Sequence, residues 1–249
     1  NVDEKIFINS EIGWLYGKIE NSNPNEALHY LYAARDLGRD DQWLNAEIGW
    51  ELGYNDKDKD EEAVKYFERS IELGRDDEWI NAEIGWELGY KAVGKDEEAV
   101  KYFERAIELG RNDEWIWIRI ADIYFDLKRY EDALKAYNKA YEFECLHNEG
   151  QASLYIRKIG KTLRRLGRYE EAIEKLLESR KLSLEEGEKA EVEDLELSYC
   201  YATLGDRDNG EKYMKLFIDS VGVRIENDEK LKKELEELKE MVNMLYHPS

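Results

Sequence analysis

The clearest alternation of apolar and polar positions lies in residues 76–111. The second half of this stretch places small and large apolar residues at spacings of four, three and three, on one face of a helix: Ala99, Phe103, Ala106 and Leu109. This predicted helix starts with acidic residues at Asp96 and ends at Gly110, a residue suited to the left-handed conformation that closes helices. A first helix, at about residues 78–90, follows Asp77, whose carboxylate can accept hydrogen bonds from the first turn.

The same pattern of two helices recurs with a period of 36 residues. Residues 40–75 repeat residues 76–111 nearly letter for letter, and a looser copy contains Glu11-Ile12-Gly13-Trp14 and later Ala27-Leu28. A period of this length, with two helices in each unit, indicates a stacked solenoid rather than one closed core.

Two later units carry large and small residues at fixed spacings. In residues 112–145 they are Trp117, Ile120, Ala121, Tyr124, Tyr130, Ala133, Tyr137 and Ala140. In residues 150–184 they are Ile156, Ile159, Gly160, Leu163, Gly167, Tyr169, Ala172 and Leu176. On these residues the chain resembles the tetratricopeptide repeat family. Small side chains let helices approach closely, and large ones fill the space between them.

The resemblance implies an all-α fold: a right-handed α-solenoid, or superhelix, of stacked antiparallel helix pairs with a C-terminal capping helix. We expect one domain over residues 1–249, with six repeats at about 4–39, 40–75, 76–111, 112–145, 150–184 and 189–222. The sixth repeat is degenerate. The first three form a 36-residue variant, in which the turn is two residues longer and the family's closing proline is replaced by Arg39, Arg75 and Arg111.

The last segment, residues 226–246, has an amphipathic pattern with a narrow apolar seam: Leu231, Leu235, Leu238, Val242 and Leu245. One interpretation is a cap that covers the exposed end of the solenoid. The alternative is a pairing helix for a dimer. Because three heptads or fewer are marginal for a free coiled coil, the cap and a monomeric chain are favoured.

Composition narrows the class of partner. The net charge of −21 disfavours nucleic acid and anionic membranes and favours basic proteins or peptides. No run of about 18 apolar residues occurs, so we expect no membrane span. Cys145 and Cys200 form no paired framework, which suggests a reduced, cytoplasmic location. Since the chain opens with Asn1 rather than Met, it could be a fragment of a larger protein.

Catalytic and metal-binding patterns are weak. His29, His147 and His247 are far apart, and Cys145 with His147 lacks a second ligand pair of zinc-like spacing. The sequence contains no GxSxG, no glycine-rich phosphate loop and no HExxH. We therefore expect a protein that is not an enzyme, with no catalytic residues, no metal and no cofactor.

Aromatic residues repeat along the predicted first helices at a spacing of seven. This aromatic ladder consists of Phe7, Trp14, Trp43, Trp50, Tyr54, Trp79, Trp86, Tyr90 and Trp115, with Glu11, Glu47 and Glu83 on the same side. By analogy with the family, these first helices line the concave groove. In one interpretation the rings pack between repeats and stiffen the stack. In the other, the rings and carboxylates bind a cationic or aromatic-rich peptide through cation–π contacts. Both interpretations can hold together.

The fifth repeat reverses the charge. The basic stripe, defined as Arg157, Lys161, Arg164 and Arg165, would face the groove in the family's register and bind a carboxylate. Alternatively, neighbouring carboxylates neutralise the stripe internally: Asp122 and Asp126 before it, Glu191 and Glu196 after it. Asp122 would also line the groove.

These observations predict a non-catalytic scaffold whose concave groove binds a protein or an extended peptide. That partner would carry a basic or aromatic segment for the ladder and an acidic one for the stripe. Two alternatives remain: a receptor module for a short signalling peptide in a bacterial regulator, and a carbohydrate-binding or carbohydrate-cleaving protein that uses tryptophan platforms and carboxylates.

Overall fold

The computed structural model describes residues 1–18, 24–55, 59–91, 94–147 and 150–221, together with Lys232, Lys233, Leu235, Glu236 and Glu240. Over these residues the regular secondary structure is entirely helical. The chain divides into two compact units, Asn1–Asn112 (unit 1) and Asp113–Ser249 (unit 2). The prediction of an all-α fold is confirmed.

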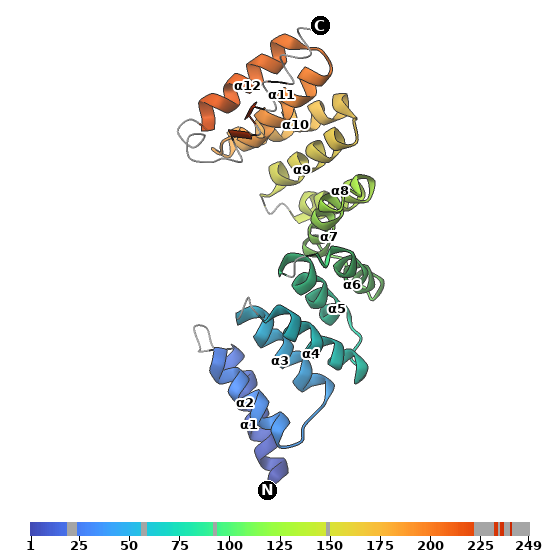
Figure 1. Ribbon diagram of the computed structural model, residues 1–249, viewed down its shortest axis with the longest axis vertical. Coiled ribbons are helices and arrows are strands. Elements are labelled where there is room, and N and C mark those ends of the chain that lie inside the picture. Colours follow the sequence, from blue (N-terminus) through green and yellow to red (C-terminus); the bar gives the residue numbers. More distant parts are fainter. Residues whose placement is uncertain are drawn as a thin grey trace. The chain divides into compact units, whose positions relative to one another are not determined.

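Unit 1 is built from pairs of helices that are consecutive in the chain and lie side by side (Figure 1). The pairs are α1 (Val2–Lys18) with α2 (Pro24–Asp36), α3 (Gln42–Asn55) with α4 (Asp60–Glu72), and α5 (Glu78–Trp86) with α6 (Asp96–Glu108). A π-helical turn, η1 (Glu87–Lys91), extends α5. The pairs stack because α2 packs against α3, and α4 packs against α5 and η1.

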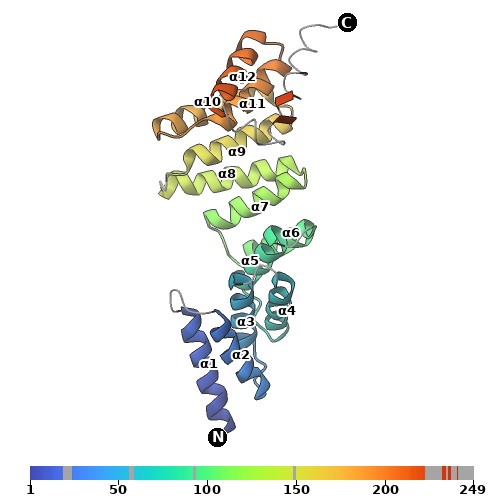
Figure 2. The ribbon, with the colours of Figure 1, turned by 60° about the vertical axis from the view of Figure 1, so that its left-hand side comes forward.

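Unit 2 follows the same plan (Figure 2). Its pairs are α7 (Glu114–Asp126) with α8 (Tyr130–His147), α9 (Ala152–Arg165) with α10 (Tyr169–Glu185), and α11 (Glu191–Thr203) with α12 (Arg207–Val221). Helix α8 packs against α9, and α10 packs against α11. Within each unit, the second helix of a pair therefore contacts the first helix of the next pair, as in a helical repeat stack.

The predicted helix ends are present in the third pair. Asp77 caps α5, since its Oδ1 accepts a hydrogen bond from the backbone N–H of Ile80 at 2.9 Å. Gly110 follows α6 with φ 113°, in the left-handed region that glycine adopts without a steric penalty. The first helix differs from the prediction in one respect: its α-helical part stops at Trp86, and the chain continues as η1.

In the first, second, third and fifth pairs, a glycine on the first helix lies against a large side chain on the second. In the third pair Ala99, Phe103 and Ala106 are fully buried, and the ring of Phe103 lies against Gly85. A Cβ added to Gly85 would lie 2.9–3.0 Å from three atoms of that ring. The small residue is thus required by close packing, as the sequence pattern predicts.

The predicted capping helix, residues 226–246, falls largely outside the described residues. Among the positions that are described, Leu235 is buried and forms an apolar cluster with Phe217 and Val221 of α12. This contact lies at the end of the last helix pair. The cap, the repeat boundaries and the single-domain assignment stay predictions.

Candidate functional site

The aromatic ladder residues of unit 1 lie in two rows along the first helices. The first row lies towards the N-terminal ends of α1, α3 and α5 and contains Phe7, Trp43 and Trp79. The second row lies one heptad later and contains Trp14, Trp50 and Trp86. Residues separated by seven share a helix face, so each helix contributes one ring to each row.

The two tryptophans of the first row contact arginines at positions where the family usually has a proline. The guanidinium carbon of Arg75 lies 5.1 Å from the ring centroid of Trp79, and its Nε donates a 2.7 Å hydrogen bond to Asp77. Arg39 makes the equivalent contacts, at 4.7 Å to the ring of Trp43 and 2.6 Å to Asp41. We call each such arrangement an arginine clamp. The sequence marked these arginines as departures from the family but gave no role for them.

Trp79 also packs against neighbouring rings. Its centroid lies 5.6 Å from that of Trp50 on α3 and 5.9 Å from that of Phe67 on α4, which meets it edge to face. These contacts agree with the interpretation in which the ladder stiffens the stack. Phe7, the first-row residue of α1, is 62% exposed.

In the second row each tryptophan stacks on an aromatic residue one helical turn later. The Trp50 and Tyr54 rings are 5.8 Å apart with an interplanar angle of 13°, and the Trp86 and Tyr90 rings are 4.4 Å apart at 22°. The tryptophans are half-buried, whereas Tyr54 is 77% exposed. We call these two stacked pairs rungs. Each rung therefore joins two rings on the same face of one helix, one turn apart.

The corresponding position in α1 is occupied by a cation instead of a tyrosine. Lys18 stands 36 residues before Tyr54, and its ammonium lies 6.0 Å from the ring centroid of Trp14. At this distance the ammonium and the ring attract each other electrostatically. The chain therefore places a cation of its own on the first tryptophan of the second row.

Carboxylates lie between the rows. Glu47 is half-buried, and burial raises the pKa of its carboxyl group, while the positive charges of Lys18 and Arg75 act in the opposite direction. Glu83 is half-buried at the equivalent position of α5. A partly desolvated carboxylate is stabilised in its ionised form by a nearby cation.

Two further glutamates, which the sequence analysis missed, lie deeper. Glu51 and Glu87 are 5% and 3% exposed. Each lies against a glycine of the preceding first helix, Gly17 and Gly53 respectively. The sequence contains one signal that could have identified them: a glutamate two positions before a glycine recurs after 36 residues. They belong to the contact between successive first helices.

In unit 2 the basic stripe contacts carboxylates of α11. Arg164 forms an ion pair with the buried Glu196 and lies 4.9 Å from the ring centroid of Tyr199. Arg157 lies 3.6 Å from Glu193, which is fully buried and accepts a 2.7 Å hydrogen bond from Ser179. The interpretation in which neighbouring carboxylates neutralise the stripe predicts ion pairs of this kind. That interpretation named Glu196 as a partner but did not name Glu193.

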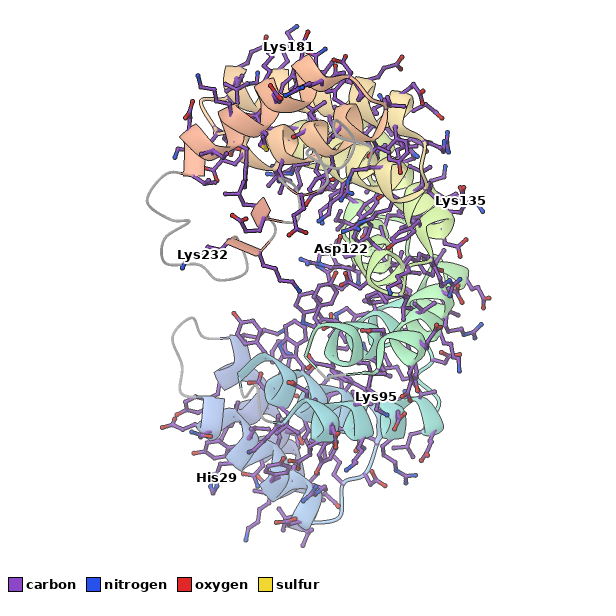
Figure 3. All side chains as sticks on the ribbon, turned by 45° about the horizontal axis from the view of Figure 1, so that its top comes forward. His29, Lys95, Asp122, Lys135, Lys181 and Lys232 are labelled. Atoms are coloured by element: carbon purple, nitrogen blue, oxygen red, sulfur yellow. The ribbon has the colours of Figure 1, made fainter. Side chains whose placement is uncertain are left out.

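The other two members of the stripe differ. The ammonium of Lys161 lies 5.3 Å from the ring centroid of Phe125, and Arg165 is exposed. Asp122 accepts hydrogen bonds from Tyr137 and Lys158, each at 2.6 Å. Figure 3 labels Asp122 on α7, and it shows Lys135 and Lys181 extending away from α8 and α10. The role of the stripe in ligand binding stays a prediction.

The last ring of the predicted ladder, Trp115, is on α7 of unit 2. It is half-buried, and the guanidinium carbon of Arg119 lies 5.8 Å from its centroid. Among the described residues, no helix is both long and apolar enough to cross a membrane. The same residues contain no cluster of three or more His, Cys, Asp or Glu side chains placed to bind a metal ion.

Comparison with protein families identifies the repeats. Residues 112–184 match one model described as tetratricopeptide repeat, and residues 87–114 match a second with the same description. The chain is a tetratricopeptide repeat protein. The matched residues include the third, fourth and fifth helix pairs in part or whole, so the assignment of six tetratricopeptide repeats stays a prediction. No curated protein sequence matches the chain.

Solved tetratricopeptide repeat structures share the fold. YrrB, described as "a TPR protein with an unusual peptide-binding site", has a TM-score of 0.64 and 17% identity, over 83% of this chain and 97% of its own. The C-terminal part of a TPR repeat-containing protein from Cytophaga hutchinsonii has a TM-score of 0.67 and 14% identity, over 92% and 87%. MamA from Desulfovibrio magneticus RS-1 has 0.61 and 17%, over 73% and 97%. At these identities the similarity concerns the fold.

Proposed function

We propose that this tetratricopeptide repeat protein is a non-catalytic interaction module that binds basic side chains of a protein or peptide on the rungs of unit 1. The observation that carries this proposal is the recurrence, after 36 residues, of a stacked tryptophan–tyrosine pair beside a half-buried glutamate. An aromatic face attracts Lys or Arg, and the carboxylate adds a charge-assisted partner.

The chain's own cations support this choice of ligand. Lys18 lies over Trp14, and Arg39 and Arg75 lie over first-row tryptophans, so aromatic rings on these helices already bind cations. The acidic character of the whole chain attracts a basic partner from a distance. YrrB, whose fold is similar, is described as having a peptide-binding site, which makes a peptide a reasonable form for the partner.

Fluorescence anisotropy with a dye-labelled, arginine-containing peptide tests this function. Replacing Trp50 or Trp86 by Leu removes one rung and should weaken binding by about threefold or more, the effect of about one cation–π contact. Phe7→Leu is the matched control, because Phe7 is an exposed ring of the same unit outside the rungs. Equal affinities for the parent chain, both rung variants and the control would show that the rungs do not bind the peptide.

A further inference from the structure

Glu47 carries the negative charge beside the Trp50–Tyr54 rung. Its carboxylate is half-buried, and none of the residues that the structure describes donates a hydrogen bond to it or forms an ion pair with it. A partly desolvated carboxylate is stabilised in its ionised form by a cation close to it. Glu47 can therefore accept the basic side chain of a ligand without first losing a partner of its own.

Lys18 of α1 lies near Glu47 because the end of α1 meets α3. Gly17, the residue before Lys18, lies so close to the carboxylate of Glu51 that an added Cβ would collide with it. Glu51 follows Glu47 by one helical turn, so both glutamates are on the same face of α3. Burial raises the pKa of the Glu47 carboxyl group, and the charges of Lys18 and Arg75 lower it in part. Two cations of the chain thus act on Glu47 without pairing with it.

The two cations differ in how firmly they are held. Arg75 donates a 2.7 Å hydrogen bond to Asp77 and lies over the ring of Trp79, so moving it disrupts the start of α5. Lys18 is exposed, and its ammonium lies 6.0 Å from the ring centroid of Trp14, at the outer limit for a cation–π contact. Lys18 can therefore change position at much lower cost than Arg75.

We propose that Lys18 controls the affinity of this site by competing with the ligand's basic side chain for Glu47. The proposal rests on the proposed function and adds a residue that regulates it. A ligand cation that pairs with Glu47 must displace the Lys18 ammonium or tolerate its repulsion. The charge is particular to this position, because tyrosines stand at the equivalent positions of the next two repeats, Tyr54 and Tyr90. Binding therefore strengthens when the charge of Lys18 is lost.

Three variants separate the charge of Lys18 from its other properties. Lys18→Met removes the charge but keeps an unbranched side chain, and Lys18→Arg keeps the charge. Lys5→Met is the matched control, because it removes the same charge from an exposed position of α1, about 20 Å from Lys18 along the helix. At an ionic strength of about 0.1 M the Debye length is about 10 Å, so the charge of Lys5 is screened from Glu47.

Fluorescence anisotropy with dye-labelled Gly-Arg-Gly-Arg-Gly-Arg-Gly measures the effect. Lys18→Met should bind this peptide about threefold or more tighter than the parent chain does. Lys18→Arg and Lys5→Met should bind it as the parent chain does. Equal affinities for Lys18→Met and the parent chain, or an equal gain from Lys5→Met, overturn the role of Lys18. The proposed function then still stands if Trp50→Leu weakens binding, and it fails if Trp50→Leu has no effect.

Titration of Glu47 followed by carbon-detected NMR tests the competition without a ligand. Because Lys18 lowers the pKa of the Glu47 carboxyl group, Lys18→Met should raise that pKa, whereas Lys5→Met should leave it unchanged. A pKa of Glu47 that is the same in Lys18→Met and in the parent chain overturns the proposal, whatever the peptide affinities are. This result leaves the proposed function intact, because it concerns only the effect of Lys18.

Discussion

Arg75 lies over Trp79, with 5.1 Å between the guanidinium carbon and the ring centroid, across the turn that leads from one helix pair to the next. The same arginine donates a hydrogen bond to Asp77, whose other oxygen caps α5. One side chain thus fixes both the tryptophan and the start of the helix. This arginine clamp occupies the place where the family usually has a proline.

The clamp predicts energetic coupling between its two residues. In a double-mutant cycle of Arg75→Ala and Trp79→Leu, we expect a coupling free energy of about 0.5–1 kcal/mol in urea unfolding. The range is modest because the Arg75 side chain is 29% exposed and water weakens the attraction. The pair of Arg75→Ala with Trp86→Leu is the control, and it should be additive. Additive effects at Arg75 and Trp79 would contradict a stabilising clamp.

The close packing at Gly85 predicts that a better helix former will destabilise the protein. Gly85→Ala should gain up to about 1 kcal/mol of helix propensity but lose about 1–3 kcal/mol through overpacking against Phe103. We therefore expect a lower midpoint in urea. Adding Gly85→Ala to Phe103→Leu should restore part of the stability that Phe103→Leu alone loses, because the smaller leucine leaves room for the added methyl group. An increased midpoint for Gly85→Ala would show that the ring can move away at little cost.

Much of the fold was predictable because helical periodicity and the 36-residue recurrence are local properties of the sequence. Asp77, Phe103 and Gly110 have the structural roles that their positions in the pattern predict. The spacing of Trp79 and Trp86 placed both on one helix face. It could not show that Trp79 lies beneath an arginine while Trp86 stacks on Tyr90, because these contacts depend on neighbouring side chains and on the turn η1.

The basic stripe illustrates the same limit. The sequence shows that its residues share a helix face. That observation fits an anion-binding site and neutralisation by neighbouring carboxylates equally well. The deciding information is which carboxylates the next helix brings near. Glu193, which the sequence analysis did not name, is fully buried beside Arg157. Burial of this kind depends on packing between repeats, which residue spacing within one helix does not specify.

Leu235 offers a test of the cap. Its side chain is buried against Phe217 and Val221, so Leu235→Ala should lower the free energy of unfolding by about 2 kcal/mol or more, through the loss of buried apolar surface and the cavity left behind. Chemical denaturation followed by circular dichroism measures this change. Sedimentation of both chains should give the same molecular mass. A variant that is unchanged in stability but altered in oligomeric state would instead support the pairing-helix interpretation.

The raised pKa of Glu47 predicts that ligand binding depends on pH. Burial raises the pKa of this carboxyl group above the usual 4.5, and a cationic ligand favours its ionised form. Affinity for an arginine peptide should therefore be full at neutral pH and decline as pH falls through the raised pKa, before an ordinary glutamate would be protonated. Glu47→Gln should bind more weakly at pH 7 and lack this step. The same pH profile for the variant and the parent would exclude Glu47 from the site.

Two-dimensional NMR of the indole N–H groups tests the central claim most directly. The chain contains seven tryptophans, and single Trp→Phe variants would assign their signals. On titration with the arginine-containing peptide of the anisotropy experiment, the signals of Trp50 and Trp86 should shift most. Those of Trp115 and Trp117 should stay near their starting positions. Saturable binding that leaves Trp50 and Trp86 unshifted would contradict the assignment of the rungs as the ligand site.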